Sequence, residues 1–190
     1  SIDYSQIELR VAAGLSGDKK LIRVFQEGGD VHTAVASEVF KVPQDKVDAE
    51  MRRRAKVINF GIIYGMGVNA LRMTLGEGVS REEASHFLND YLNDFPQLTA
   101  FLEKTKGDAA RTGYTETLFG RKRYFAGFRS PLPQIRAAAE RMAINAPVQG
   151  TAADIIKLAM VKVDEWIEKE GLHDDVKMLL QVHDELVFEI

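Results

Sequence analysis

Four side chains spaced four residues apart could bind a molecule that is anionic at one end and flat at the other. They are Arg52, Lys56, Phe60 and Tyr64, within the stretch MRRRAKVINFGIIYGMG. In a helix they would fall on one slowly drifting line, called here the cationic–aromatic stripe. At about 1.5 Å rise per residue the stripe would extend roughly 18 Å, which is comparable to an extended nucleoside triphosphate. The alternative for the basic run by itself is a solvated face of an ordinary amphipathic helix, and short basic runs are frequent.

Acidic residues that could bind a divalent cation lie near both ends of the chain. Asp3 precedes a predicted helix, and Asp184 and Glu185 separate the apolar runs KMLLQV and LVFEI. Carboxylate oxygens held on rigid strands are suitable ligands for Mg²⁺. The alternatives are a cap or turn role for Asp3 and a polar turn at Asp184.

The elements that must position these residues are mostly helices. Ser5 and Glu8 form the pattern of a capping box, which predicts a helix from Ser5 or Gln6, and a second such box begins at Ser80. Asp18 and Asp30 are predicted N-caps of further helices. A glycine inside a helix costs about 1 kcal/mol relative to alanine, so Gly61 indicates that some group approaches the backbone closely.

Two hairpins are predicted in the C-terminal half. YTETLF and RKRYF flank Gly120, and the triplet that begins at Arg121 is either a solubilising surface or a contact for a phosphate backbone. Pro147 is predicted to break a helix and Thr151 to cap the next one. KMLLQV and LVFEI are predicted to form a buried hairpin with the acids at its tip.

Composition sets limits on the class of protein. The 190 residues are 45% hydrophobic, enough for a substantial core, and 25 basic residues face 28 acidic ones. Contacts with phosphates must therefore come from local basic clusters rather than from the net charge. Because cysteine is absent, disulfides, thiolate metal sites and cysteine nucleophiles are excluded.

Three motifs, in this order, give the chain a specific resemblance. DYSQIELR at 3–10, RRRAKVINFGIIYG at 52–65 and QVHDE at 181–185 resemble the polymerase motifs of family A DNA polymerases, the bacterial DNA polymerase I type. ETLFGRKR and NAPVQGTAAD between them match the family as well. The resemblance covers essentially the whole chain.

This resemblance implies an α+β fold that is predominantly helical, with a partial palm built on a small antiparallel sheet and a helical fingers subdomain. The implied parts are the start of the palm at 1–28, fingers at 29–112 with a nucleotide-binding helix at 51–65, and palm at 113–190 with an acidic-tipped hairpin at 176–190. Family members carry a thumb and usually an exonuclease-like domain upstream of the segment, so a fragment is expected.

The resemblance also implies a two-metal reaction. Asp3, Asp184 and the backbone carbonyl of Tyr4 would bind two Mg²⁺ ions, with Mn²⁺ as a substitute. Glu185 would lie near the metals in a secondary role, and Lys56 would protonate the departing pyrophosphate.

Nucleotide-binding roles follow from the same match. Arg52, Lys56 and His32 would contact the triphosphate, although a lone histidine is more often a surface or capping residue. Phe60 would pack on the incoming sugar and base, and Tyr64 would stack near the template. The nucleotide-binding set is completed by Gln6 and by Glu8, which resembles the steric gate that selects deoxynucleotides.

DNA-binding roles are implied for residues in the second half of the chain. These are Arg121, Arg141, Asn145, Gln149 and His183. Except for Arg121, whose triplet would contact the phosphate backbone, they would contact primer-template near its terminal pair through minor-groove acceptors common to all base pairs.

The implied function is DNA-directed DNA polymerase, adding deoxynucleotides to a primer 3′-OH and releasing pyrophosphate. The expected partners are primer-template DNA and deoxynucleoside triphosphates, with no membrane and a monomeric state. The expected location is the cytoplasm, at the bacterial nucleoid or in a phage-infected cell, with an organelle left open. The alternatives are a catalytically incompetent DNA-binding fragment and a metal-dependent phosphohydrolase or nuclease.

Overall fold

The structure, a computed structural model, describes residues 1–76 and 78–190. The chain is mostly helical with two small antiparallel sheets, as predicted. The helices are α1 (Ile7–Ser16), α2 (Lys19–Gln26), α3 (Val31–Phe40), α4 (Ala49–Ile63), α5 (Val68–Leu75), α6 (Arg81–Asp94), α7 (Pro96–Thr112) and α8 (Pro133–Lys169), with 3₁₀ turns η1 (Gln44–Lys46) and η2 (Ala126–Arg129). The strands are β1 (Ile2–Asp3), β2 (Tyr114–Glu116), β3 (Lys122–Tyr124), β4 (Lys177–Val182) and β5 (Glu185–Glu189).

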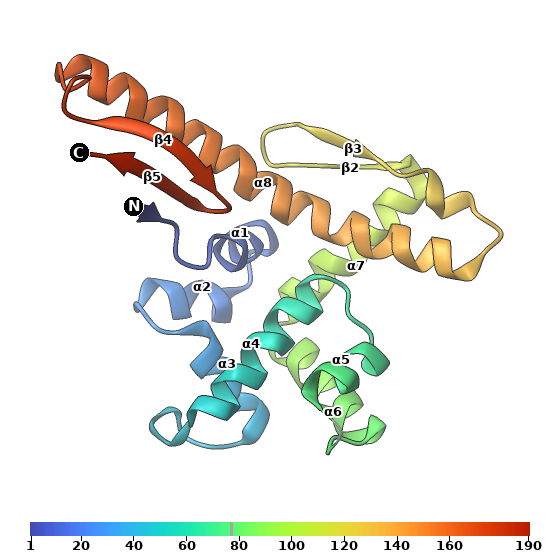
Figure 1. Ribbon diagram of the computed structural model, residues 1–190. Helices are drawn as coiled ribbons and strands as arrows, with labels where there is room; N and C mark the ends of the chain where they lie inside the picture. The colour runs from blue at the N-terminus through green and yellow to red at the C-terminus, as the bar shows by residue number, and fades with distance from the viewer. Residues whose placement is uncertain (77) are drawn as a thin grey trace.

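Helix α8 is the long central helix along which the two hairpins lie (Figure 1). The β4–β5 hairpin lies beside its C-terminal half, the β2–β3 hairpin beside its N-terminal half, and helices α1 to α7 extend away on one side. The larger sheet has the order β1-β5-β4, so the first strand pairs with the last. This pairing brings the two ends of the chain together.

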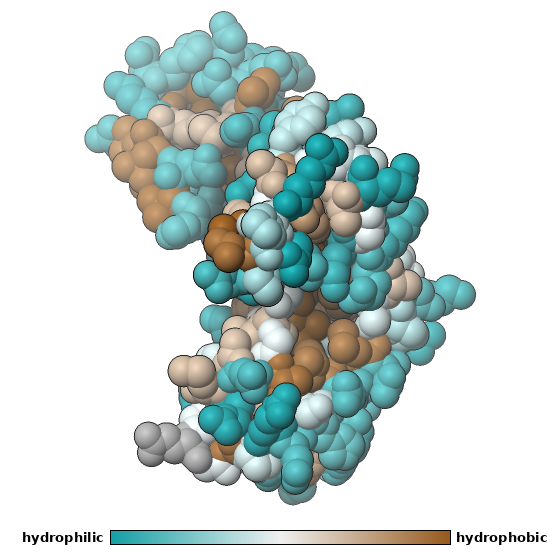
Figure 2. All heavy atoms as spheres, turned by 90° about the vertical axis from the view of Figure 1, so that its right-hand side faces the viewer, coloured by the Kyte–Doolittle hydropathy of each residue, from teal (hydrophilic) through white to brown (hydrophobic). Residues whose placement is uncertain are grey.

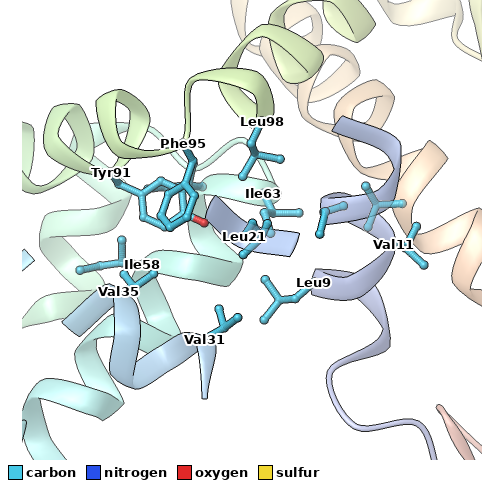
Figure 3. Packing of buried hydrophobic residues seen from close by; sticks show 14 of the residues in the cluster. Leu9, Val11, Leu21, Val31, Val35, Ile58, Ile63, Tyr91, Phe95 and Leu98 are labelled. Carbon is cyan, nitrogen blue, oxygen red and sulfur yellow. The ribbon is translucent and has the colours of Figure 1, made fainter. Parts of the chain in front are cut away.

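The main core lies among the helices and reaches α1 (Figure 3). Leu9 of α1 and Leu21 of α2 have no exposed surface, and they meet Val35, Ile58 and other fully buried side chains of α3 and α4. Burying one such aliphatic side chain contributes about 1.5–3 kcal/mol. The stripe-bearing helix α4 is therefore fixed to α1, which follows Asp3 directly.

A buried aspartate joins two of these helices. Asp18 has no exposed surface and accepts hydrogen bonds from the amides of Lys20 and Leu21 at the start of α2. Its second oxygen accepts from the amides of Gln97 and Leu98 at the start of α7. The predicted caps at Asp30 and Ser80, including the Ser80–Glu83 box, are also confirmed.

The predicted capping box at Ser5 is wrong. Helix α1 begins at Ile7, and its N-cap Gln6 has a left-handed backbone (φ 57°) and makes no side-chain cap bond. The Glu8 carboxylate instead accepts a hydrogen bond from the Tyr64 hydroxyl, so it does not return to the helix start. A tertiary contact has displaced the local one.

The predicted helix break at Pro147 and the cap at Thr151 are also wrong. Helix α8 continues through a buried Pro147, even though proline there removes a backbone hydrogen bond. Thr151 lies inside the helix, and its hydroxyl accepts from the amide of Leu118 in the β2–β3 connection at 3.0 Å. Packing against α1, α7 and β2 compensates for the missing bond.

The C-terminal hairpin forms where predicted, but the prediction that it is buried is wrong for β4. Leu179, Leu180 and Val182 are 54%, 50% and 45% exposed. Strand β4 is the edge of the sheet, and only β5 contributes a fully packed side chain, Leu186. The apolar run correctly predicted a strand, but not which surface covers it.

Figure 2 shows the side of the molecule that is on the right in Figure 1. Hydrophilic residues predominate on this face, with small apolar patches between them. No helix among the described residues is both long and apolar enough to cross a membrane.

Candidate active site

The first acidic residue meets the last pair through the larger sheet. In the antiparallel pairing of β1 with β5, Asp3 lies opposite Glu185, and the amide of Tyr4 donates to the carbonyl of Asp184 at 3.3 Å. His183 at the hairpin tip has a left-handed backbone (φ 55°), and the Gln181 side chain donates to the His183 carbonyl at 2.7 Å. The tip that carries Asp184 is thus held by one backbone bond and one side-chain bond.

The donors at this place suit a hard cation. Asp3 is exposed and Asp184 is half-buried, so solvent and ligands reach both. Among the described residues no group of three or more His, Cys, Asp and Glu side chains could hold a metal ion. The predicted donor types, two carboxylates and the Tyr4 carbonyl, nevertheless suit Mg²⁺, which takes oxygen ligands, uses few protein carboxylates and keeps positions for water and phosphate.

Helix α4 carries Arg52, Lys56 and Phe60 of the predicted cationic–aromatic stripe, and Tyr64 is its C-cap residue. Arg52 and Lys56 are exposed, while Phe60 and Tyr64 are half-buried with ring centroids 5.9 Å apart. The close approach predicted at Gly61 comes from the chain itself, because a Cβ there would lie 2.9 Å from the Met66 sulfur.

Tyr64 ties the aromatic end of the stripe to α1. Its hydroxyl donates to the Glu8 carboxylate. Burial of the Tyr64 phenol raises its pKa strongly, and the Glu8 charge raises it further. Tyr64 therefore stays protonated and keeps Glu8 in place at neutral pH.

One cavity brings Phe60 of the stripe together with Asp184, while Arg52, Lys56, Tyr64 and Asp3 are not part of its lining. It has a volume of about 330 Å³, and its lining includes Gln6, Glu8, Phe60, Gln149 and Asp184. These residues come from the α1 start, α4, α8 and the hairpin tip. Three of the predicted nucleotide-binding residues, Gln6, Glu8 and Phe60, therefore share one space with a carboxylate that was predicted from a separate motif to bind metal.

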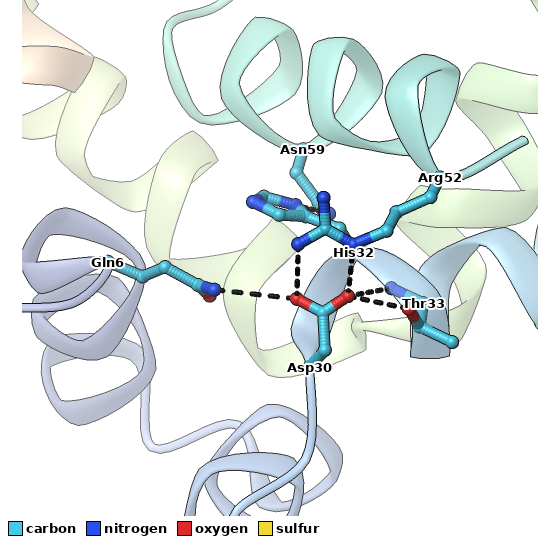
Figure 4. A network of polar contacts seen from close by, with 6 residues as sticks. All are labelled: Gln6, Asp30, His32, Thr33, Arg52 and Asn59. Atoms are coloured by element: carbon cyan, nitrogen blue, oxygen red, sulfur yellow. Dashed lines mark hydrogen bonds and ion pairs between the residues drawn. The ribbon is translucent and has the colours of Figure 1, made fainter. Parts of the chain in front are cut away.

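His32 and Arg52 belong to a polar cluster beside this cavity (Figure 4). His32 is 3% exposed, its Nδ1 lies 3.0 Å from Asn59 Nδ2, and its ring centroid lies 5.7 Å from that of Phe60. Burial lowers the pKa of His32, and the charges of Arg52 and Lys56 lower it as well, although the Asp30 charge acts to raise it. Arg52 forms an ion pair with Asp30 at 2.8 Å.

The sequence did not predict that Asp30 and Asn59 belong to this cluster. Asp30 was predicted only as a helix cap, which it is, and Asn59 lies on the buried side of α4. The signal that could have found Asp30 is a cap carboxylate placed two residues before His32.

The predicted DNA-binding residues lie in three places: three on α8, Arg121 between β2 and β3, and His183 at the tip of the β4–β5 hairpin, where it lines the cavity. Arg141, Asn145 and Gln149 follow each other at four-residue intervals on α8, and Gln149 lines the cavity. The Asn145 side-chain oxygen is buried and has no hydrogen-bond partner among the described residues. Arg141 packs closely against Gly65, at the end of the stripe.

Arg121 is engaged inside the chain. It donates to the Asp154 carboxylate and to the Gly150 carbonyl, each at 2.9 Å. The ion pair holds the β2–β3 hairpin on α8.

Comparisons with known proteins place this chain in a family. The family model described as DNA polymerase family A matches residues 1–190. "DNA polymerase I, thermostable" of Thermus aquaticus is 54% identical over 189 residues, which is 100% of this chain and 22% of that protein. DNA polymerase I of Pseudomonas aeruginosa is 50% identical over 188 residues, which is 99% of this chain and 20% of that protein.

A solved structure agrees in fold. It is described as the "POL domain of Pol1 from M. smegmatis complex with DNA primer-template and dNTP", with a TM-score of 0.93 and 46% identity over 99% of this chain and 32% of that one. The fold and the family match thus define the class, a segment of a polymerase POL domain. Because the family match covers the whole chain, the protein belongs to DNA polymerase family A, of the DNA polymerase I type. It spans about a fifth of the length of these curated relatives.

Proposed function

We propose that this segment carries the nucleotidyl-transfer centre of a DNA-directed DNA polymerase. The observation that supports the proposal most is the cavity in which Phe60 and Glu8 meet Asp184, next to the strand pair that holds Asp3. A phosphohydrolase would need the acids but would have no use for the stripe. The proposed location is the bacterial cytoplasm, at the nucleoid, since the relatives named above are bacterial.

In the proposed reaction a primer 3′-OH attacks the α-phosphate of a deoxynucleoside triphosphate, and pyrophosphate leaves. Asp3, Asp184 and the Tyr4 carbonyl would hold two Mg²⁺ ions, with Mn²⁺ as a substitute. When bound, the ions would lower the pKa of the 3′-OH and stabilise charge on the phosphates. Glu185, which lies opposite Asp3 in the sheet, would have a secondary role beside the metal ions.

The stripe would bind and orient the nucleotide. Arg52 and Lys56 would hold its phosphates, and Lys56 would deliver a proton to the leaving pyrophosphate. Phe60 would pack on the sugar and base. His32, whose ring is buried against Phe60, would contribute a ring edge to the phosphate site.

Residues beside the stripe would select the nucleotide. Glu8, held by Tyr64, would reject a ribose 2′-hydroxyl, and Gln6 would line the same space. Tyr64 would stack beside the template base.

Primer-template DNA would lie along α8 and the hairpin tip. Arg141, Asn145, Gln149 and His183 would contact the minor groove near the primer end. Arg121 would contact the DNA backbone from the β2–β3 hairpin. The M. smegmatis neighbour was solved with DNA primer-template and dNTP, which supports these partners.

The test is Asp184→Ala in a full-length chain that carries this sequence. We expect Mg²⁺-dependent primer extension to be abolished while primer-template affinity stays within about twofold, because DNA affinity arises mainly from contacts to phosphate and groove. Asp174→Ala, an exposed acid outside the site, is the control and should extend normally. Undiminished extension by the Asp184 variant would refute the proposal.

A further inference from the structure

Asp30 places a negative charge beside the side chain that is proposed to bind phosphate. Its carboxylate lies between the start of α1 and the first turns of α3 and α4 (Figure 4). An anion at this position opposes the binding of another anion unless it has a compensating role. The contacts of Asp30 indicate what that role is.

The ion pair with Arg52 engages only one side of the guanidinium. Nε donates to one Asp30 oxygen at 2.8 Å and Nη2 donates to the other at 3.2 Å. A guanidinium has five N–H donors in a planar fork. This side-on geometry uses two of them and leaves the edge formed by Nη1 and the second Nη2 hydrogen for another oxygen ligand, so carboxylate and phosphate can bind at the same time.

Asp30 itself is held by three donor groups besides Arg52. The Thr33 amide and hydroxyl donate to one oxygen at 2.9 and 2.6 Å, and the Gln6 side chain lies 3.4 Å from the other. These donors fix the carboxylate relative to α3 and to the start of α1, where Gln6 also lines the cavity. A carboxylate held in this way cannot follow a moving arginine, but it can fix one.

We propose that Asp30 is a positioning residue that orients the Arg52 guanidinium, so that its free edge receives a phosphate of the incoming nucleotide. This inference rests on the proposed function and adds to it a residue that does not touch the nucleotide. Arginine has several rotatable bonds, so orienting it before the ligand arrives removes an entropic cost from binding.

The test is Asp30→Asn in a full-length chain. Asparagine has the same shape and is an equally good helix cap, so α3 should keep its start. The charge is lost, and one oxygen becomes an amide group that cannot accept from arginine. We expect the KM for deoxynucleoside triphosphate to rise about tenfold, the order of a charge-assisted hydrogen bond, while kcat changes less than about twofold.

A double-mutant cycle separates positioning from a merely structural role. In an Arg52→Ala background, Asp30→Asn should change KM by less than about twofold. An equal tenfold rise in both backgrounds would overturn the inference, as would a fall in KM for the single variant, which would mean that Asp30 competes with phosphate.

Two further variants complete the design. Thr33→Val keeps the side-chain shape and removes one donor to Asp30, so it should raise KM in the native background and not in Arg52→Ala; this variant decides if Asp30→Asn does not fold. Asp48→Asn changes another N-cap carboxylate, which bonds the Met51 amide, and should leave KM unchanged.

Failure of this inference and failure of the proposed function are distinguishable. A chain that extends primers and loses extension in Asp184→Ala, but shows additive effects at Asp30 and Arg52, refutes the positioning role alone. A native chain that does not extend primers refutes the proposed function.

Discussion

At the scale of single residues, the charges near the stripe are set by their neighbours. Partial burial acts to raise the pKa of Asp30, but hydrogen bonds from Arg52 and Thr33 outweigh it and hold the pKa at about 2. The stabilisation that this carboxylate provides is therefore fully present above its ordinary pKa of 3.8 and is lost as the pH falls through about 2.

This lowered pKa can be measured at one amide. Because the Thr33 N–H donates to Asp30, its proton resonance should report the ionisation of the carboxylate. We expect the Thr33 amide shift, followed by NMR in threonine-labelled protein, to titrate with a midpoint near pH 2. Arg52→Ala should move the midpoint upward. A midpoint near 3.8 in the native chain would show that the ion pair does not form.

Lys56 is the residue of the stripe with the most demanding proposed role. Because it would both bind phosphate and donate a proton, Lys56→Ala should lower kcat by about 100-fold or more and raise KM for the nucleotide. Arg53→Ala is the matched control, since Arg53 pairs with Glu50 on a different face of α4 and should behave as the native chain. Steady-state primer extension measures both, and a loss confined to KM would argue against proton donation.

At the scale of elements, α8 organises both sheets, and one glycine allows the β2–β3 hairpin to pack on it. A Cβ at Gly150 would lie 2.6 Å from the Thr117 methyl carbon. Thr117 is buried and β-branched, so it cannot swing aside freely.

Gly150→Ala should therefore push the hairpin away from α8 at a cost of about 1–3 kcal/mol. Hydrogen exchange at the Leu118 amide, which donates to Thr151, should become faster. Gly107→Ala on α7 is the control, because a Cβ there meets nothing within 4 Å, and it should be neutral or stabilising by up to about 1 kcal/mol. Equal protection of Leu118 in both variants would contradict this account.

The elements show what local sequence can and cannot predict. Asp18, Asp30 and Ser80 identified helix starts because a cap acts on its own first turn. The capping box predicted at Ser5 does not form because Glu8 accepts a hydrogen bond from Tyr64, which is far away in the sequence. The helix break predicted at Pro147 does not occur because the packing of α8 outweighs the backbone bond that proline removes. Strand β4 was predicted as a strand, but its exposure depends on neighbours that periodicity does not reveal.

At the scale of the whole molecule, the proposed function depends on distant segments meeting around one cavity. The stripe could be predicted from its spacing, and the acids from their place beside apolar runs. Their proximity could not, because it depends on the pairing of β1 with β5 and on the core that fixes α4 to α1. The resemblance to family A motifs supplied that link, and the fold agrees with it.

The most direct measurement is a crystal structure of a full-length chain with Mn²⁺, primer-template DNA and a nonhydrolysable deoxynucleoside triphosphate. Anomalous scattering would locate the metal. We expect Mn²⁺ within bonding distance of the carboxylates of both Asp3 and Asp184, with the triphosphate reaching from the metal to Arg52 and Lys56. Mn²⁺ bound away from either carboxylate, or a triphosphate that does not touch the stripe, would contradict the proposed function.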